Sequence, residues 1–195
     1  MTNRVNRIYD VELRALDNQD SRDVEGYAVV FNAKTDLGWF TEEIDKDAFR
    51  NTDMSNVYLL FNHDENNVLA GTSNGSLKMV IDDKGLFQTS KIIDTSLGED
   101  ILKLVRSGLI NKMSFGFTID EDGGEEWISG VEKDHRIIRK IDKLYDVSLV
   151  SYPAYPQTSA YARSMQSDEL AELHKRRKEQ DKKLERILSN GKSNE

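Results

Sequence analysis

The chain has 195 residues, a length that fits one ordinary domain with a hydrophobic core and a short additional segment. Charged residues make up 32% of it and its net charge is −8, which argues against nucleic acid as the main partner because phosphate binding needs a basic surface. It has no cysteine, which excludes a thiol nucleophile and thiolate metal ligands, and no apolar stretch as long as a membrane span, so we expect a soluble, non-secreted protein.

Two apolar stretches near the N-terminus predict a β-hairpin. Residues 8–16 and 24–31 carry the apolar positions of two strands, and Asn18–Ser21 between them has the composition of a turn. Further along, Asp45 is suited to cap one short helical turn, because its side chain can accept a backbone hydrogen bond.

The next part of the chain predicts a buried strand, a second hairpin and a helix. The apolar run 57–61 is typical of a buried strand and ends just before His63. Residues 76–93 contain two apolar runs around a glycine-containing turn, which indicates a hairpin. We expect Ser96 to cap a helix that ends at Gly108, since apolar residues recur between them at helical spacing.

Two later segments alternate between apolar and small or polar residues, as strands with unlike faces do. In Lys112–Ile119 the large apolar side chains predict a core face, and Ser114 lies on the opposite face. That face has no bulky residue near Ser114, so we expect its hydroxyl to be uncovered. In 144–150, Asp146 lies on the more polar face.

The composition changes after about Arg163. From Met165 to Glu195 there are eight basic and seven acidic residues and few apolar ones. Helix-forming residues and Glu–Lys pairs predict one charged helix with a thin apolar stripe. We therefore divide the chain into a domain at 1–163 and a helical tail at 164–195.

The chemistry open to this chain depends on a serine, a histidine and a carboxylate. A serine needs a base to take its proton at neutral pH, and a buried carboxylate can orient a histidine for that task. Ser114, His63 and Asp146 can form such a triad, and Lys112 leaves a Ser–Lys dyad as an alternative. The plainer alternatives are an ordinary strand serine, a loop histidine paired with Asp64 and a solvated Asp146.

Several motifs, taken in order, resemble those of the prohead (capsid maturation) proteases of HK97-type tailed bacteriophages. The resemblance covers about Gly26 to Arg163. Its motifs are Gly26-Tyr27-Ala28, Ala48-Phe49, Phe61-Asn62-His63-Asp64, Met113-Ser114-Phe115-Gly116-Phe117 and the run from Asp146 to Ala154.

The resemblance implies a serine endopeptidase that needs no metal or cofactor. It implies an α+β, mainly β fold like that of the herpesvirus assemblins: a mostly antiparallel β-barrel with surrounding helices. It assigns the nucleophile to Ser114 and the general base to His63. Asp146 is the preferred third member of the triad, and His135 is the alternative by residue type.

The resemblance also implies partners and a place of action. The expected substrates are the major capsid protein and the scaffold protein, cut inside the assembling prohead in the host cytoplasm. We expect a homodimer or higher oligomer, and a tail that contacts scaffold or is removed by self-cleavage. The competing hypotheses are a non-enzymatic assembly protein built on the same barrel, and an unrelated β-domain that binds a peptide at a sheet edge.

Overall fold

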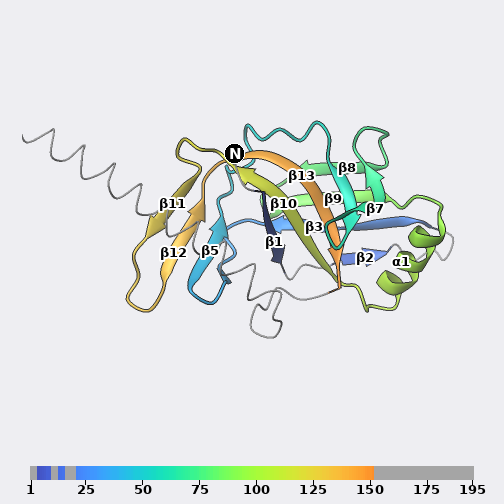
Figure 1. Cartoon of the computed structure of the whole chain (residues 1–195), viewed down its shortest axis with the longest axis horizontal. Coiled ribbons are helices and arrows are strands. Elements are labelled where there is room, and N and C mark those ends of the chain that lie inside the picture. Colours follow the sequence, from blue (N-terminus) through green and yellow to red (C-terminus); the bar gives the residue numbers. More distant parts are fainter. Residues whose placement is uncertain (1–3, 10–12, 16–20, 152–195) are drawn as a thin grey trace, which may run out of the picture. The chain divides into compact units, whose positions relative to one another are not determined.

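The computed structural model describes residues 4–9, 13–15 and 21–151, which form strands β1 to β13 and one helix, α1 (Figure 1). The chain divides into two compact units, Met1–Ala154 and Tyr155–Glu195, and every described residue belongs to the first. The predicted boundary at residue 163 and the predicted charged helix at 164–195 lie outside the described residues.

The strands form three sheets. The site sheet has the order β1 (Val5–Tyr9), β10 (Lys112–Ile119), β13 (Ile141–Val150), β6 (Tyr58–Phe61) and β7 (Asp64–Gly71). The cover sheet has the order β2 (Leu13–Ala15), β3 (Asp23–Val30), β9 (Gly85–Lys91) and β8 (Leu77–Ile81). The end sheet has the order β11 (Glu125–Ile128), β12 (Asp134–Ile138), β5 (Phe40–Ile44) and β4 (Thr35–Asp36).

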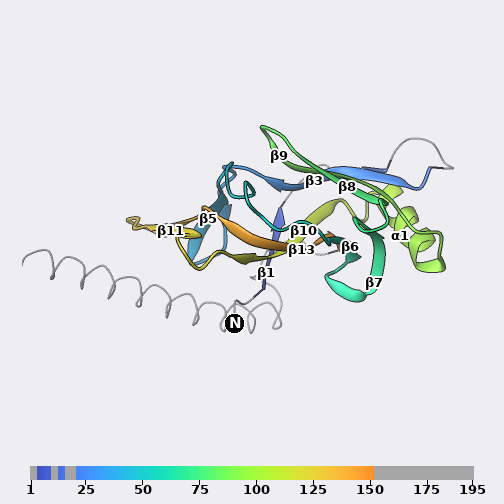
Figure 2. The ribbon, with the colours of Figure 1, turned by 90° about the horizontal axis from the view of Figure 1, so that it is seen from above.

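The main core lies between the site sheet and the cover sheet. Figure 2 shows β3, β8 and β9 as one layer above β10, β13 and β6. The predicted core face of β10 is confirmed: Met113, Phe115, Phe117 and Ile119 are all buried, and the rings of Phe115 and Phe117 stack 4.7 Å apart. The contact between the two layers therefore fixes which face of β10 looks away from the core, and that face carries Ser114.

A mainly β fold is confirmed, but the closed barrel is wrong for the described part of the chain. A barrel needs the two outer strands of a sheet to pair with each other. Here β1 and β7 are the outer strands of the site sheet, and β12 and β13, which follow each other in sequence, belong to different sheets. Alternation predicts strands but not their neighbours, so it missed both this division and the parallel pairs β13–β6 and β12–β5.

The expected surrounding helices are also wrong for the described residues, in which α1 (Ser96–Arg106) is the one helix. It begins one residue earlier than predicted, because Thr95 is the N-cap and accepts a hydrogen bond from the Gly98 amide. Asp45 follows β5 and accepts from the Asp47 amide at 2.8 Å, so it starts a turn and not a helix. No helix in the described ranges combines the length and apolar character needed to cross a membrane.

The first predicted hairpin is half right. β2 pairs antiparallel with β3, and β8 pairs antiparallel with β9 as expected of the second hairpin. The predicted strand at 8–16, however, divides into β1 and β2. β1 leaves this pairing and adds to the outer edge of β10, antiparallel, with Ile8 opposite Ser114. This different partner for β1 decides what surrounds Ser114.

Candidate active site

A tight turn between β6 and β7 places the ring of His63. Phe61 pairs with Asp64, so Asn62 and His63 form a two-residue turn, and their φ values are 55° and 57°. Positive φ at both central residues matches the right-handed strand twist, but it is unfavourable for residues other than glycine. A histidine held in this conformation indicates that the surrounding structure imposes it.

Asn62 provides much of this restraint by joining the turn to the end of β13. Its backbone amide donates to the Leu149 carbonyl at 2.9 Å, and its side-chain oxygen accepts from the Ser151 amide at 3.0 Å. The turn therefore cannot swing away from β13 without losing these bonds. The effect is to hold the ring of His63 beside the face of β13 that carries Asp146.

The pairing of β10 with β13 brings the other two predicted residues to the same face. Ser114 lies opposite Ser148, and Gly116 lies opposite Asp146. His63 Nε2 is 2.6 Å from the Ser114 hydroxyl, and His63 Nδ1 is 2.7 Å from Asp146 Oδ2. The structure thus brings Ser114, His63 and Asp146 into one hydrogen-bonded chain.

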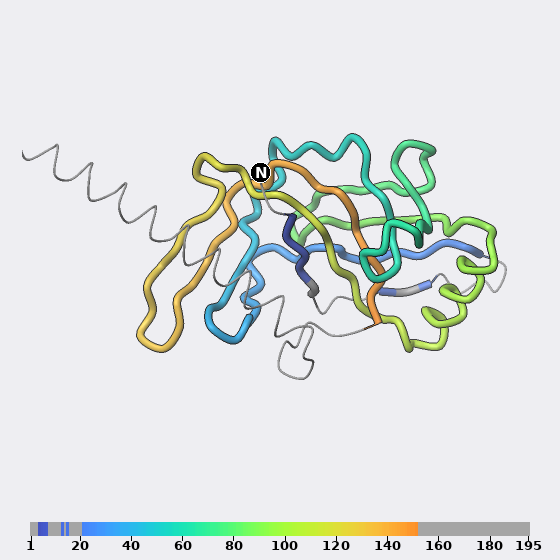
Figure 3. The backbone as a smooth tube through the Cα atoms, in the orientation of Figure 1, coloured from blue at the N-terminus to red at the C-terminus, as the bar shows by residue number. Residues whose placement is uncertain are grey.

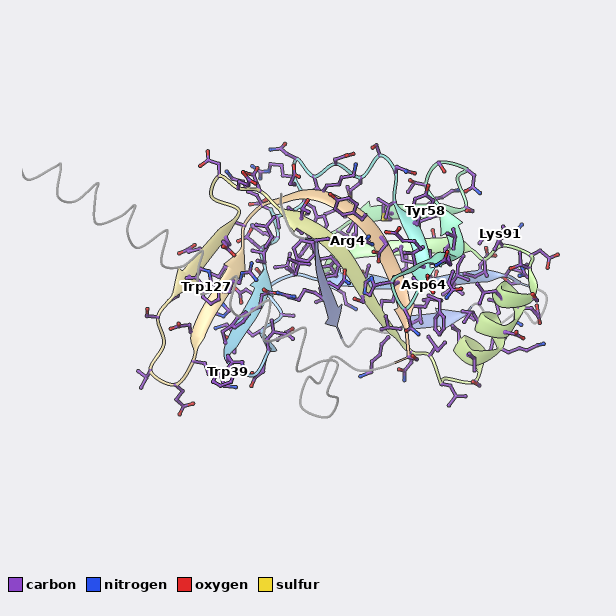
Figure 4. All side chains as sticks on the ribbon, in the orientation of Figure 1. Arg4, Trp39, Tyr58, Asp64, Lys91 and Trp127 are labelled. Atoms are coloured by element: carbon purple, nitrogen blue, oxygen red, sulfur yellow. The ribbon has the colours of Figure 1, made fainter. Side chains whose placement is uncertain are left out.

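Asp146 is buried, and its carboxylate is surrounded by donors. The Ser148 hydroxyl donates to Oδ2 at 2.8 Å, and Arg4, labelled in Figure 4, forms an ion pair with Oδ1. Burial would raise the pKa of Asp146, but the hydrogen bond and charge of His63, the charge of Arg4 and the Ser148 hydroxyl together lower it. The carboxylate is therefore ionised at neutral pH and points at the histidine.

Ser114 is fully buried, so the expectation of an uncovered hydroxyl is wrong. The physical reason is β1, which pairs along the outer edge of β10 and whose backbone supplies a second partner: the Ser114 hydroxyl donates to the Arg7 carbonyl at 2.7 Å. Side-chain size on β10 could not predict this cover, because it is contributed by another strand.

Gly116 makes room for the carboxylate. A Cβ at this position would lie 2.5 Å from Asp146 Oδ1 and 2.8 Å from both Arg4 Nε and Asn6 Oδ1. Real Cβ atoms do not approach neighbours this closely, so any larger residue would displace Asp146 or Arg4. The small residue two positions after Ser114 is thus a condition for the close approach of Asp146.

The other residues considered for this triad have different partners. His135 lies on β12 in the end sheet, where its Nδ1 meets the Thr41 hydroxyl at 2.8 Å and its Nε2 is 3.3 Å from Glu43. Asp64 accepts hydrogen bonds from Asn66 and Asn67, so it is not the partner of His63.

Two further alternatives concern Asp146 and the remaining histidine. The burial of Asp146 rules out a solvated edge residue. His174 lies outside the described residues. No cluster of metal-ligating side chains occurs among the residues that the structure describes.

Three neighbours of the site were missed by sequence reasoning. Ser148 could have been identified from the sequence, because it follows Asp146 by two residues and so lies on the same strand face. The sequence evidence for Asn62 was weaker: asparagine is frequent in left-handed turns. Nothing in the sequence indicated Arg4, because its position depends on the pairing of β1 with β10. The group formed by Ser114, His63, Asp146, Ser148 and Arg4 is called the site cluster below.

The comparisons with known proteins give a family match and a similarity to one solved structure. The family model described as "Caudovirus prohead serine protease" matches residues 9–172, well over half of the chain. Among solved structures, the chain is similar to the bacteriophage T4 capsid assembly protease, gp21, with 12% sequence identity and a TM-score of 0.47, over 76% of this chain and 99% of that one. No curated protein gives a significant match.

Proposed function

We propose a mechanism for this chain, which belongs to the caudovirus prohead serine protease family. In it, Ser114 is the nucleophile of an endopeptidase, His63 is the general base and Asp146 orients His63. The observation that carries the proposal is the continuous contact from Ser114 Oγ through the His63 ring to Asp146, at 2.6 and 2.7 Å. This is the geometry by which a serine–histidine–carboxylate triad is recognised on any fold.

The proposed reaction has two halves. Ser114 Oγ attacks the carbonyl carbon of the scissile peptide bond while its proton passes to His63 Nε2. The carbon–nitrogen bond then breaks, and His63 returns that proton to the leaving amine, which leaves an acyl group on Ser114. In the second half, water attacks the acyl carbon while His63 takes a proton from it. The bond between that carbon and Ser114 Oγ then breaks, and His63 returns the proton to Ser114.

The surroundings of His63 suit this proton transfer. The ionised Asp146 accepts from Nδ1, which leaves Nε2 as the nitrogen that faces Ser114. The negative charge also stabilises the imidazolium that forms after the first transfer. Arg4 and Ser148 are positioning residues in this proposal, because they bind the Asp146 carboxylate and act on the reaction through it.

The proposed substrates are the major capsid protein and the scaffold protein of a prohead, and the chain itself can be a third. They follow from the family, whose name places the protease in the assembling capsid. Action inside the prohead, in the host cytoplasm, and assembly as a homodimer or larger oligomer belong to the same proposal. The tail at 164–195 is the segment proposed to contact scaffold or to be removed by self-cleavage.

Intact-mass measurement tests the proposed chemistry. The full chain is incubated alone and with its capsid and scaffold proteins, beside Ser114→Ala and His63→Ala. We expect discrete fragments from the wild type and none from either variant.

Two matched controls are available in the chain. Ser90 is also a buried serine that donates to a backbone carbonyl, at 3.2 Å, and His135 is also a partly buried histidine with a carboxylate neighbour. We expect Ser90→Ala and His135→Ala to cleave like the wild type. Intact masses from the folded wild type, with the partner proteins present, would support the non-enzymatic assembly hypothesis instead.

A further inference from the structure

β1 occupies a place that a substrate needs. It is the outer strand of the site sheet and pairs with β10 over Val5–Tyr9, with Ile8 opposite Ser114. In Figure 3 the dark blue trace of β1 lies beside the yellow-green trace of β10. Sheet edges are where proteases and peptide-binding domains receive extended peptides, because an unpaired strand offers a row of backbone donors and acceptors. With β1 in place, this edge is filled and Ser114 is fully buried.

The hydrogen bonds of Ser114 show that β1 also competes with catalysis. A serine hydroxyl has a single proton to donate. In this structure two acceptors lie close to it: the Arg7 carbonyl at 2.7 Å and His63 Nε2 at 2.6 Å. A proton directed at the Arg7 carbonyl is not available to His63. The backbone of β1 therefore opposes the proton transfer that activates the nucleophile.

The side chain of Arg7 fastens β1 on the opposite face of the sheet. Its Nε and Nη2 atoms donate to Glu42 at 2.5 and 3.1 Å, and Arg136 Nη1 donates to the same carboxylate at 2.9 Å. Arg136 Nε in turn donates to Glu125 at 2.7 Å. These four residues are called the Glu42 cluster below.

Charge is balanced in the Glu42 cluster only while β1 is docked. Arg7, Glu42 and Arg136 are buried, and two guanidinium groups face two carboxylates. Burial would raise the pKa of Glu42, but the charges and hydrogen bonds of Arg7 and Arg136 lower it, so Glu42 stays ionised. Withdrawal of Arg7 would leave two buried carboxylates facing one guanidinium, which is costly unless another cation replaces it.

We propose that the outer edge of β10 is the surface that receives an extended peptide, and that β1 is an internal stand-in for this peptide. β1 must leave the edge before Ser114 can meet a substrate. The peptide that takes its place runs antiparallel to β10 and carries an arginine or lysine where Arg7 now lies, so that Glu42 regains its cation. This inference rests on the proposed function of Ser114.

The test measures how fast Ser114 reacts with a small fluorophosphonate. In this reaction Ser114 Oγ bonds to phosphorus, fluoride leaves and the hydroxyl proton passes to His63. The full chain is compared with Arg7→Gln and Arg7→Lys, and labelling is located by peptide mass spectrometry. We expect labelling of Arg7→Gln to be about 10- to 100-fold faster, because a charge-assisted hydrogen bond shifts an equilibrium by about that factor. Arg7→Lys should stay close to the wild type.

The matched control is Arg136→Gln, which removes a guanidinium from the same cluster but from β12 instead of β1. We expect its labelling rate to equal that of the wild type. The hexapeptide with the sequence of residues 4–9 should slow the labelling of Arg7→Gln by refilling the edge, and the same hexapeptide carrying Arg7→Glu should not.

The outcomes separate this inference from the proposed function. Equal labelling of Ser114 in all forms, or equal acceleration in Arg136→Gln and Arg7→Gln, overturns the inference and leaves the proposed function standing. Absence of label from Ser114 in every form overturns both.

A second measurement serves if Arg7→Gln does not fold. In the wild-type chain, we expect the amides of β1 to exchange hydrogen about tenfold or more faster than those of β13, since a strand that leaves its edge opens without global unfolding. Exchange of β1 as slow as that of β13 would overturn the inference.

Discussion

Two largely buried polar groups of this protein differ in what they can do, although each contains an arginine from the N-terminal segment: Arg4 in the site cluster and Arg7 in the Glu42 cluster. The Glu42 cluster contains two guanidinium groups and two carboxylates, joined by hydrogen bonds. The site cluster contains a hydroxyl, an imidazole and a carboxylate in a line. Burial and charge alone therefore do not distinguish a structural cluster from a chemical one.

The difference lies in the protons. Arginine stays protonated and Glu42 stays ionised at neutral pH, so no proton in the Glu42 cluster has a second place to go. In the site cluster, the Ser114 proton has two acceptors, and histidine can take it in the physiological pH range. His63 is also held in a backbone conformation that is unfavourable outside glycine. In our proposal, the proton with two acceptors and the imposed backbone conformation of His63 distinguish the site cluster from the Glu42 cluster.

The largest expected effect is on the catalytic rate and comes from Asp146→Asn. The amide keeps the size of the side chain but cannot hold His63 in the required tautomer, and a comparable change in a serine protease lowers kcat about 10⁴-fold. Peptide-bond cleavage by the folded variant measures this. Asp142→Asn, on the same strand but exposed, is the control and should cleave at the wild-type rate. Full activity in Asp146→Asn would remove the distinction between the two clusters.

The next largest effect is on stability and comes from the Glu42 cluster. Arg136→Gln leaves Glu42 and Glu125 with a single guanidinium, and breaking a buried ion pair costs about 3–5 kcal/mol. Denaturant unfolding measures this loss in free energy. Because Arg136 is not part of the site cluster, we expect the folded fraction of Arg136→Gln still to react at Ser114. If Arg136→Gln were as stable as the wild type but inactive, the chemistry would belong to the Glu42 cluster and not to the site cluster.

A smaller effect is expected from Gly116→Ala. The added Cβ would lie 2.5 Å from Asp146 Oδ1, so Asp146 must move. Overpacking of this kind costs about 1–3 kcal/mol of unfolding free energy. We expect the cleavage rate of the folded variant to fall further than this loss of stability explains. Gly71→Ala is the control, because its Cβ would meet only ordinary contacts, the nearest at 3.4 Å from Tyr58. Equal behaviour of the two variants would contradict the tight fit around Asp146.

The smallest effect is a pH dependence of stability. The pKa of Asp146 is lowered in the folded chain, so its contribution is complete above the ordinary aspartate pKa of about 4. It is lost as the pH falls through the lowered value, because the unfolded chain then binds the proton more readily. The midpoint temperature of thermal unfolding should therefore fall less steeply between pH 5 and pH 2 for Asp146→Asn than for the wild type. Parallel curves would show that Asp146 gains nothing from its partners.

The sequence was most informative where a pattern is local. The alternation of β10 gave its bounds and its core face, and the helix was found to within one or two residues because caps and apolar spacing lie within the segment itself. Residue type and strand position left Ser114, His63 and Asp146 as one possible triad beside plainer alternatives, and the family resemblance supplied their roles.

The rest depends on contacts between distant segments. The residues of β1 show a strand but not that its partner is β10, more than 100 positions away, so the cover over Ser114 and the roles of Arg4 and Arg7 could not be predicted. The closed barrel was wrong for the same reason: each strand pattern is compatible with several neighbours. Asn62 and His63 have positive φ because Phe61 pairs with Asp64, which the residue types alone do not specify.

The most direct test of the central claim is the position of a fluorophosphonate adduct on the full-length chain. We predict an adduct on Ser114 that is absent from His63→Ala and present in His135→Ala, because His63 and not His135 contacts the Ser114 hydroxyl. An equally rapid adduct on Ser114 in His63→Ala, or no adduct on Ser114 in a preparation that cuts its capsid protein, would contradict the assignment.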